Sequence, residues 1–174
     1  MKDRDLYLKQ LIELKDKPLI KVISGIRRCG KSSLLTLLES HLLKEGVSSN
    51  RILRMNFESF EFDEIKNYKD LYQYIEGNLD AAQDKCYILL DEVQQVQDWE
   101  KGVNALLVDF DVDIYITGSN AYLLSSELST LLSGRYVEIK MQPLSFKEYL
   151  AFSEDISEEG LENAVRFVVE VVHL

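Results

Sequence analysis

GIRRCGKS, at residues 25–32, is the stretch that decides the fold. It follows a mainly apolar run at residues 19–23 and leads into the leucine-rich residues 33–38, which predicts a strand, a glycine loop and a helix in succession. Gly25 and Gly30 can take backbone angles that a Cβ would forbid, so the loop can curl with its N–H groups pointing at an anion. The N-terminus of the following helix adds the positive end of its dipole. This spacing is typical of a phosphate-binding loop, the P-loop.

The lysine and the serine that close the loop have separate predicted tasks. Lys31 is expected to reach the β- and γ-phosphates of a bound nucleotide, and the Ser32 hydroxyl is expected to ligate Mg²⁺. The alternative is a glycine turn with a surface lysine, but chance rarely also supplies the strand before and the helix after. The predicted nucleotide-binding residues are Gly25, Ile26, Arg27, Arg28, Cys29, Gly30, Lys31, Ser32 and Ser33.

A second apolar run, residues 86–90, ends in the acidic pair Asp91 and Glu92. Continuous apolar character is typical of a central parallel strand. Asp91 is predicted to hold Mg²⁺ through its water shell, and Glu92 is predicted to orient and deprotonate an attacking water. A solvated acidic strand end is the alternative, and without the P-loop the pair alone would be weak evidence. A carboxylate directly after the metal-binding aspartate favours ATP hydrolysis over phosphorylation of a small molecule.

Predicted strands alternate with predicted helices along the chain. Such alternation indicates an α/β fold with a parallel sheet and right-handed crossovers, which for a P-loop protein means three layers. Strands are predicted over residues 19–23, 51–57, 86–90, 112–117 and 135–141. Helices are predicted over residues 5–14, from 33 to a stop at Gly46, over 68–79, from a cap at Asp98 to 110, from Ser125 or Ser126 to Gly134, and from Ser145 onward.

The composition fits one domain with a hydrophobic core. The chain has 174 residues, of which 46% are hydrophobic. Its formal net charge of −10 argues against a uniformly basic nucleic-acid face, although a local basic patch is compatible with it. The first residues carry no apolar signal core, and no apolar stretch is long enough to span a bilayer. Two cysteines, Cys29 and Cys86, suggest no disulfide framework, which predicts a reducing, cytoplasmic compartment.

Cys29 allows two interpretations because it lies inside the loop. The loop N–H groups and the neighbouring cations Arg28 and Lys31 can activate its thiol, and bound ATP would then shield it from alkylation. Alternatively, cysteine is simply a small residue that fills the loop.

Polar residues also follow the fourth predicted strand. Ser119 and Asn120 come just past its end, at the carboxyl edge where open α/β sheets bind ligands. A polar side chain there can touch a γ-phosphate or the attacking water, and Asn120 is slightly preferred to Thr117 and Ser119 for this task. An ordinary Gly-Ser-Asn turn is the alternative.

Taken together, these motifs resemble the AAA+ ATPase superfamily. More narrowly, the chain resembles a bacterial and archaeal group usually described only as ATP-binding proteins or predicted ATPases. The resemblance covers roughly residues 3–150. The P-loop and the acidic pair are specific to P-loop ATPases, and the Gly-Ser-Asn and Ser-Gly-Arg runs point to the narrower group. The motifs that carry it are residues 25–32, 90–92, 116–120, 132–135 and 143–146.

The resemblance implies the strand order 5-1-4-3-2 and a ligand site at the carboxyl edge of the sheet. It also implies that the polar residue after the fourth strand, preferentially Asn120, senses the γ-phosphate. Arg135 matches the position of an arginine finger just before the fifth strand, although a surface arginine after a glycine stop fits equally well. Asn56 matches the position from which a polar residue can hold the catalytic glutamate idle, although a strand-end cap is the favoured interpretation.

Members of this group usually continue into a second, C-terminal domain. Here the composition turns acidic over residues 154–162, and the sequence departs from the group after Arg166-Phe167, where members tend to show an aromatic residue and two glycines. The expected division is an AAA+-like ATPase domain at residues 1–152 and a tail at residues 153–174. That tail would be the truncated or altered start of a C-terminal region.

The expected function is Mg²⁺-dependent binding and hydrolysis of ATP, coupled to conformational change in a larger protein. Glu92, Asn120 and Arg135 are the expected catalytic residues, and Ser32 and Asp91 are the expected metal ligands. Two alternatives stay open: a nucleotide-gated protein-binding switch with little turnover, and a DNA-handling ATPase of the helicase-loader kind. Further copies of the chain and an unidentified protein are the expected partners besides ATP, whereas the net charge gives nucleic acid no support.

Overall fold

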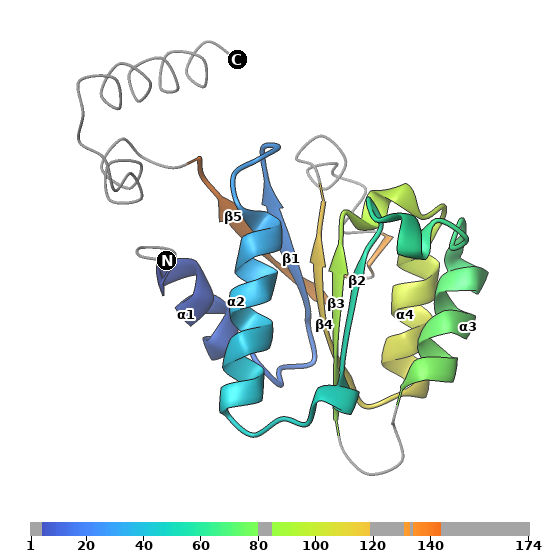
Figure 1. The fold of residues 1–174 in the computed structure, drawn as a ribbon, viewed down its shortest axis with the longest axis horizontal. Helices are drawn as coiled ribbons and strands as arrows, with labels where there is room; N and C mark the ends of the chain where they lie inside the picture. Colours follow the sequence, from blue (N-terminus) through green and yellow to red (C-terminus); the bar gives the residue numbers. More distant parts are fainter. Residues whose placement is uncertain (1–4, 80–84, 119–130, 133, 144–174) are drawn as a thin grey trace.

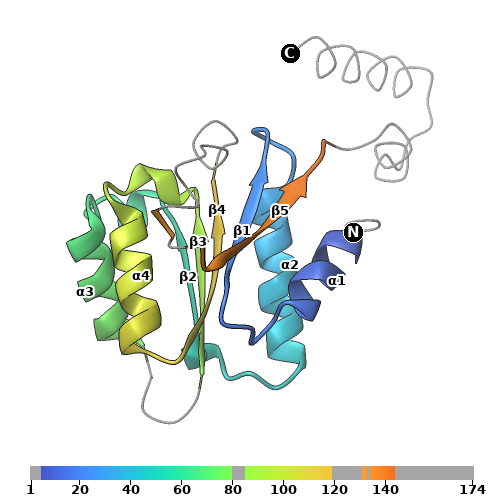
Figure 2. The same ribbon diagram turned by 180° about the vertical axis from the view of Figure 1, so that it is seen from behind.

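A parallel sheet with helices on both faces forms the molecule, as a computed structural model shows (Figure 1). The structure describes residues 5–79, 85–118, 131–132 and 134–143. Helices α1 and α2 cover one face of the sheet, and α3 and α4 cover the other, so three layers result; the view from behind in Figure 2 shows the same division. The predicted α/β class and its layers are therefore confirmed.

The boundaries of the elements agree closely with the sequence pattern. The strands are β1 (Ile20–Gly25), β2 (Ile52–Asn56), β3 (Cys86–Asp91), β4 (Val112–Thr117) and β5 (Tyr136–Met141). The helices are α1 (Asp5–Glu13), α2 (Lys31–Lys44), α3 (Tyr68–Asn78) and α4 (Trp99–Asp109), and three short 3₁₀ turns cover Ser49–Arg51, Phe60–Phe62 and Val93–Gln95. The strands lie in the order β2-β3-β4-β1-β5, which confirms the predicted order 5-1-4-3-2.

The position of each strand in the sheet follows from how apolar it is. Every residue of β1, β3 and β4 is buried, and these are the three central strands. The edge strands β2 and β5 are only partly buried. All neighbouring strands pair in parallel, so their carboxyl ends meet at one edge of the sheet. Register places Asn56 beside Asp91 and Gly25 beside Met141 at that edge.

Two apolar clusters hold the layers together, one on each face of the sheet. The first lies under α3 and α4 and includes Leu71, Ile75, Trp99 and Val103. The second lies under α1 and α2 and is supplied largely by the buried leucines of α2, Leu34, Leu35, Leu38 and Leu42. Burying one such leucine contributes about 1.5–3 kcal/mol, so the face that anchors α2 also anchors the loop that precedes it. No helix among the described residues is long and apolar enough to cross a bilayer.

Helix ends follow local chemistry, with one exception. Asn67 and Asp70 form a capping box at the start of α3. Helix α2 ends just before Gly46, whose φ of 88° makes it the predicted stop. Asp98, predicted to cap α4, does not do so: it takes a left-handed conformation and accepts no capping hydrogen bond, and its carboxylate instead pairs with Lys101 at 3.2 Å. The Asp98 carboxylate thus contacts a side chain of the first turn and leaves the N–H groups of that turn uncapped by a side chain.

Several predictions fall outside the described residues. They are the short helix predicted from Ser125 or Ser126, the helix predicted from Ser145, the polar pair Ser119 and Asn120, and the tail at residues 153–174.

Candidate functional site

The glycine loop joins the end of β1 to the start of α2. A Cβ added to Gly25 would lie 2.7 Å from the carbonyl oxygen of Met141 and 2.7 Å from Cys29 Sγ, so no larger residue fits between β1 and β5 there. Gly30 opens α2 in the left-handed region with φ of 94°. Arg28 also takes positive φ, 64°, although it carries a Cβ. The loop therefore curls as the sequence predicts, and one of its turns is made by an arginine.

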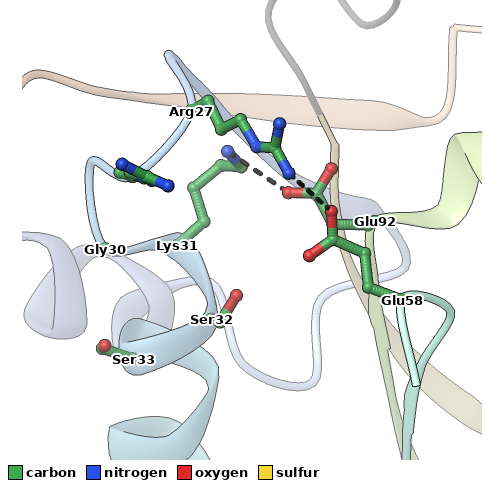
Figure 3. Close-up of a pocket in the computed structure, with 8 residues that line it drawn as sticks. Arg27, Gly30, Lys31, Ser32, Ser33, Glu58 and Glu92 are labelled. Atoms are coloured by element: carbon green, nitrogen blue, oxygen red, sulfur yellow. Dashed lines mark ion pairs between the residues drawn. The ribbon is translucent and has the colours of Figure 1, made fainter.

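Lys31 lies almost entirely inside the curl of the loop. Its side chain is 4% exposed, and Nζ lies 3.3 Å from the carbonyl oxygen of Gly25 and 3.4 Å from that of Ile26. The same ammonium lies 3.4 Å from Oε1 of Glu92, as the dashed line in Figure 3 shows. Residues 61 positions apart in sequence are thus brought into an ion pair at the carboxyl edge of the sheet.

Both oxygens of the Glu92 carboxylate have partners. Oε1 faces Lys31, and Oε2 accepts a hydrogen bond from Gln94 Nε2 at 2.6 Å. Glu92 leaves β3 in the left-handed conformation, with φ of 55°, which directs the chain away from the strand and into the short turn Val93–Gln95. The carboxylate is consequently held at the loop, where the sequence predicts a base.

Asp91, the last residue of β3 and the neighbour of Glu92 in the chain, is fully buried. Its Oδ1 accepts a hydrogen bond from the Thr117 hydroxyl at 2.5 Å. Its Oδ2 is buried and has no hydrogen-bond partner among the residues that the structure describes. A buried carboxylate oxygen without a partner is costly in free energy unless a cation or a proton donor meets it. Asp91 therefore offers one oxygen as a candidate metal ligand.

A cavity of about 350 Å³ opens over the loop. It is lined by Arg27, Arg28, Gly30, Lys31, Ser32, Ser33, Glu58 and Glu92. Arg27 reaches from the loop toward Glu58, with 3.6 Å between the guanidinium and the carboxylate, and Figure 3 shows this pair spanning the cavity. Three cations and the first turn of a helix surround the space, which is the chemistry that binds a phosphate chain.

Three members of the predicted loop set, Gly25, Ile26 and Cys29, are not among the residues that line this cavity. Ile26 is 40% exposed at the tip of the loop. Cys29 is 3% exposed and packs in the apolar cluster under α1 and α2. Burial of this kind opposes alkylation with or without a ligand, so the structure supports the interpretation of Cys29 as a small residue that fills the loop.

Arg135 lies at the opposite edge of the sheet. The amide of Ile20, the first residue of β1, donates to the carbonyl oxygen of Arg135 at 2.8 Å, and Ile20 pairs with Tyr136. Gly25, where the loop begins, pairs with Met141 five residues further along β5. At about 3.3 Å per residue, the two ends are separated by roughly 17 Å, which is farther than an arginine side chain extends. Arg135 does not reach the loop of its own chain.

Two side chains that touch the acidic pair or the loop, Glu58 and Gln94, were not predicted for this site, and a third, Thr117, was predicted only as an alternative to Asn120. Glu58 follows β2, Gln94 follows Glu92 by two residues, and Thr117 ends β4. No motif marks Glu58 or Gln94, so only the close approach of their elements could have found them. The backbone N–H of Glu58 donates a hydrogen bond to Asn56 Oδ1 at 3.0 Å. This bond supports the interpretation of Asn56 as a strand-end cap over a contact with Glu92.

Comparison with known proteins agrees with the fold. The family match and the fold together define an AAA+ P-loop ATPase domain. A family model described as an AAA domain matches residues 17–150, and the chain belongs to that family. A structure of a DNA polymerase III gamma subunit-related protein from Thermotoga maritima has a TM-score of 0.60 at 15% identity, covering 89% of this chain and 52% of that one. The Aeropyrum pernix ORC1 protein in complex with DNA has a TM-score of 0.60 at 14% identity, covering 95% of this chain and 50% of its own. At these identities the two structures show a shared fold.

Closer relatives are longer than this chain. An uncharacterized protein of Haemophilus influenzae is 56% identical over 150 residues, which make up 86% of this chain and 38% of that protein. An uncharacterized protein of Methanocaldococcus jannaschii is 36% identical over 133 residues, 76% of this chain and 28% of that protein. The chain thus spans less than half the length of these relatives.

Proposed function

We propose that this domain binds ATP with Mg²⁺ at the loop of residues 25–32 and hydrolyses the γ-phosphate with Glu92 as the base. The observation that carries the proposal is the meeting of Lys31 and Glu92 at 3.4 Å beside a cavity lined by cations, next to a buried Asp91 whose Oδ2 has no hydrogen-bond partner among the described residues. A loop lysine and a strand-end glutamate in this arrangement face the same bound phosphate from two sides.

The loop supplies the contacts to the phosphates. Its N–H groups and the start of α2 favour negative charge, and Arg27 and Arg28 add to this field from the wall of the cavity. Lys31 now shares its ammonium between two carbonyl oxygens and Glu92. A phosphate carries more charge than a carboxylate, so nucleotide binding draws Lys31 away from Glu92 and frees Oε1.

The residues present fit a magnesium ion. Mg²⁺ prefers oxygen ligands and is commonly held by one or two carboxylates together with substrate phosphates. Asp91 Oδ2 is such an oxygen, although Asp91 is buried and does not itself line the cavity, and the exposed Ser32 hydroxyl lies in the first turn of α2 on the cavity wall. Asp91 and Ser32 would hold the ion, which neutralises charge that develops on the phosphates during transfer.

Glu92 orients and deprotonates the attacking water in this proposal. Once Lys31 turns to the phosphate, Oε1 can accept the proton of a water, while Gln94 continues to hold Oε2. Asn120 is proposed to contact the γ-phosphate from the end of β4. Arg135, which does not reach its own loop, is proposed to act at the site of a neighbouring copy, where a guanidinium stabilises developing phosphoryl charge.

The wider role proposed for the domain is to couple ATP turnover to conformational change in a longer, cytoplasmic protein. The relatives support this extension because the matched region is a minor part of their length. Copies of the same chain and a further protein would be the partners that respond to the nucleotide.

Two substitutions test binding and chemistry separately. Lys31→Ala removes a charge-assisted contact worth about 1.5–3 kcal/mol, so calorimetry should show ATP affinity reduced about ten- to a hundredfold. Lys44→Ala, at the far end of the same helix, is the matched control and should bind ATP like the parent. Glu92→Gln should bind ATP normally but release phosphate about 10²–10⁴-fold more slowly.

Each part of the proposal has an outcome that contradicts it. Unchanged ATP affinity in folded Lys31→Ala protein would remove the P-loop assignment. Parental turnover in Glu92→Gln would show that Glu92 is not the base. Tight ATP binding by the parent without any phosphate release would leave a nucleotide-gated switch instead of an ATPase.

A further inference from the structure

We propose that Thr117 is a positioning residue that orients both acidic groups of the site through one hydroxyl. The inference rests on the proposed function and assigns a task to a residue that the proposed function does not use. Thr117 is the last residue of β4, it is fully buried, and β4 lies between β1 and β3 in the sheet. The strand that carries the loop and the strand that carries the acidic pair therefore flank it.

The hydroxyl of Thr117 makes two hydrogen bonds of opposite sense. It donates to Asp91 Oδ1 at 2.5 Å, and it accepts from the backbone N–H of Glu92 at 2.9 Å. An ionised carboxylate can only accept, so the hydroxyl proton must point at Asp91, and a lone pair is left for the Glu92 amide. Both capacities of the side chain are thereby used, and neither bond can be replaced by water at a fully buried position.

These bonds determine which oxygen of Asp91 is available. With Oδ1 held by Thr117, the carboxylate plane cannot turn freely, and Oδ2 is presented without a partner among the described residues. The second bond ties down the amide of Glu92, whose φ of 55° is a conformation that side chains with a Cβ rarely adopt. One hydroxyl thus holds the candidate metal ligand and supports the strained turn that aims the candidate base.

Thr117→Val tests this assignment because valine has the shape of threonine without the hydroxyl. Groups that orient a metal ligand typically contribute 10–100-fold to metal affinity. Calorimetry should compare ATP affinity with excess Mg²⁺ and with EDTA for the parent, Thr117→Val, Thr117→Ser and Ile116→Val. In EDTA all four should bind ATP alike, because the loop holds the phosphates without the ion.

We expect Thr117→Val to lose only the part of its ATP affinity that depends on Mg²⁺. The gain in affinity on adding Mg²⁺ should be about 10–100-fold smaller in Thr117→Val than in the parent. Thr117→Ser, which keeps the hydroxyl, and Ile116→Val, which trims a buried neighbour without a polar contact, should keep the parental gain. In an Asp91→Asn background, Thr117→Val should cause no further loss, because its effect passes through Asp91.

Opposite outcomes overturn the inference. If folded Thr117→Val protein gains as much ATP affinity from Mg²⁺ as the parent, the hydroxyl does not orient Asp91. The same conclusion holds if Thr117→Ser loses as much of this gain as Thr117→Val. If Thr117→Val fails to fold, Thr117→Ala takes its place: alanine likewise has no donor for Asp91, and a full gain there overturns the inference equally. If the parent binds ATP but gains nothing from Mg²⁺, this inference fails while nucleotide binding stands; if the parent does not bind ATP, the proposed function fails and takes the inference with it.

Discussion

Two residues of the candidate site hold strained backbone conformations. Among the described residues, four that carry a Cβ have positive φ: Asp16, Arg28, Glu92 and Asp98. Arg28 and Glu92 both line the cavity over the loop. A residue held in this region costs about 1–3 kcal/mol and persists only where its surroundings or its function require it. At the scale of single residues, the conformations of Arg28 and Glu92 therefore reduce the stability of the protein at its candidate site.

Arg28→Gly should separate stability from binding. Glycine takes φ of 64° without the steric penalty of a Cβ, so the free energy of unfolding should rise by about 1 kcal/mol. The same change removes one of three cations from the cavity wall, so ATP affinity should fall. Urea unfolding measures the first effect, and calorimetry measures the second.

Arg27→Gly is the matched control. Arg27 has the same charge and lies next to Arg28 on the cavity wall, but its φ is not positive. This variant should also weaken ATP binding, yet it should gain no stability, because no strain is relieved. Equal changes in unfolding free energy for the two variants would contradict the strain argument.

At the scale of elements, a buried polar network joins β1 and β4 near the amino ends of the strands. Lys21 on β1 pairs with Asp113 on β4, and both are buried. The Tyr115 hydroxyl donates to Asp113 at 2.9 Å, and the backbone N–H of Asp16 donates to the same carboxylate at 2.8 Å. A buried pair of this kind adds little net stability when it is intact, but its members cannot be removed singly without leaving a charge unpaired.

Burial lowers the pKa of the lysine in this network and raises the pKa of the tyrosines in and beside it. Burial lowers the pKa of Lys21, against the opposing effect of Asp113. Burial raises the pKa of Tyr115, and the neighbouring Asp113 raises it further. The pKa of Tyr87 is raised in the same way by burial and by a hydrogen bond to Asp16.

These shifts predict a loss of stability at high pH. Above a pH of about 10 the unfolded chain releases its tyrosine protons while the folded protein retains them, so unfolding becomes more favourable as pH rises. Lys21 acts in the opposite sense up to its ordinary value of 10.5, because the unfolded chain binds its proton more tightly. A net decline should therefore be clear above that value, with a slope approaching about 2.7 kcal/mol per pH unit for two retained protons.

Tyr115→Phe tests the origin of that decline. At pH 7 the variant should lose about 1 kcal/mol for one hydrogen bond. Above pH 10.5 its unfolding free energy should fall less steeply than the parent's, by about 1.4 kcal/mol per pH unit, because one retained proton is absent. Urea unfolding from pH 7 to pH 11 measures both slopes. Parallel slopes for parent and variant would show that Tyr115 does not retain its proton.

At the scale of the whole molecule, the proposed catalytic residues lie at opposite ends of the strands. The loop, Asp91 and Glu92 lie at the carboxyl edge, and Arg135 lies at the amino edge beside Ile20. An arginine that contributes to phosphate transfer from this position must act on another copy. Supplied by a neighbouring subunit, such an arginine can raise the rate by about 10³–10⁵.

Arg135→Ala should therefore bind ATP normally and hydrolyse it slowly. The parent's phosphate release per subunit should rise with protein concentration, since each site needs a neighbour. Mixing Arg135→Ala with Glu92→Gln should restore part of the activity, because one type of interface pairs an intact Glu92 with an intact Arg135. An inactive mixture, combined with a parental rate that does rise with concentration, would refute the role of Arg135.

The loop and the acidic pair could be predicted from the sequence because their chemistry is local. GIRRCGKS contains within eight residues the glycines, the lysine and the serine that a phosphate requires, and the run ending at Asp91 and Glu92 carries its own strand signal. The alternation of apolar segments likewise indicated the α/β class and the approximate bounds of all five strands. Each of these features depends on neighbours along the chain.

Other features depend on contacts between distant segments, and only the tertiary structure decided them. Thr117 meets Asp91 across 26 residues, since β3 and β4 pair in a register that a one-residue slip would destroy. The positions of Arg135 and Glu58 also depend on strand pairing. Pairing of β5 with β1 keeps Arg135 away from the loop, and the order of the strands brings Glu58, which follows β2, close to it. Asp98 was predicted to cap α4 from its residue type alone. In the structure its side chain pairs with Lys101 and makes no capping hydrogen bond. Sequence patterns specify which groups are available, whereas the register of the sheet determines which of them meet, because hydrogen bonds and ion pairs form only between atoms within a few ångströms.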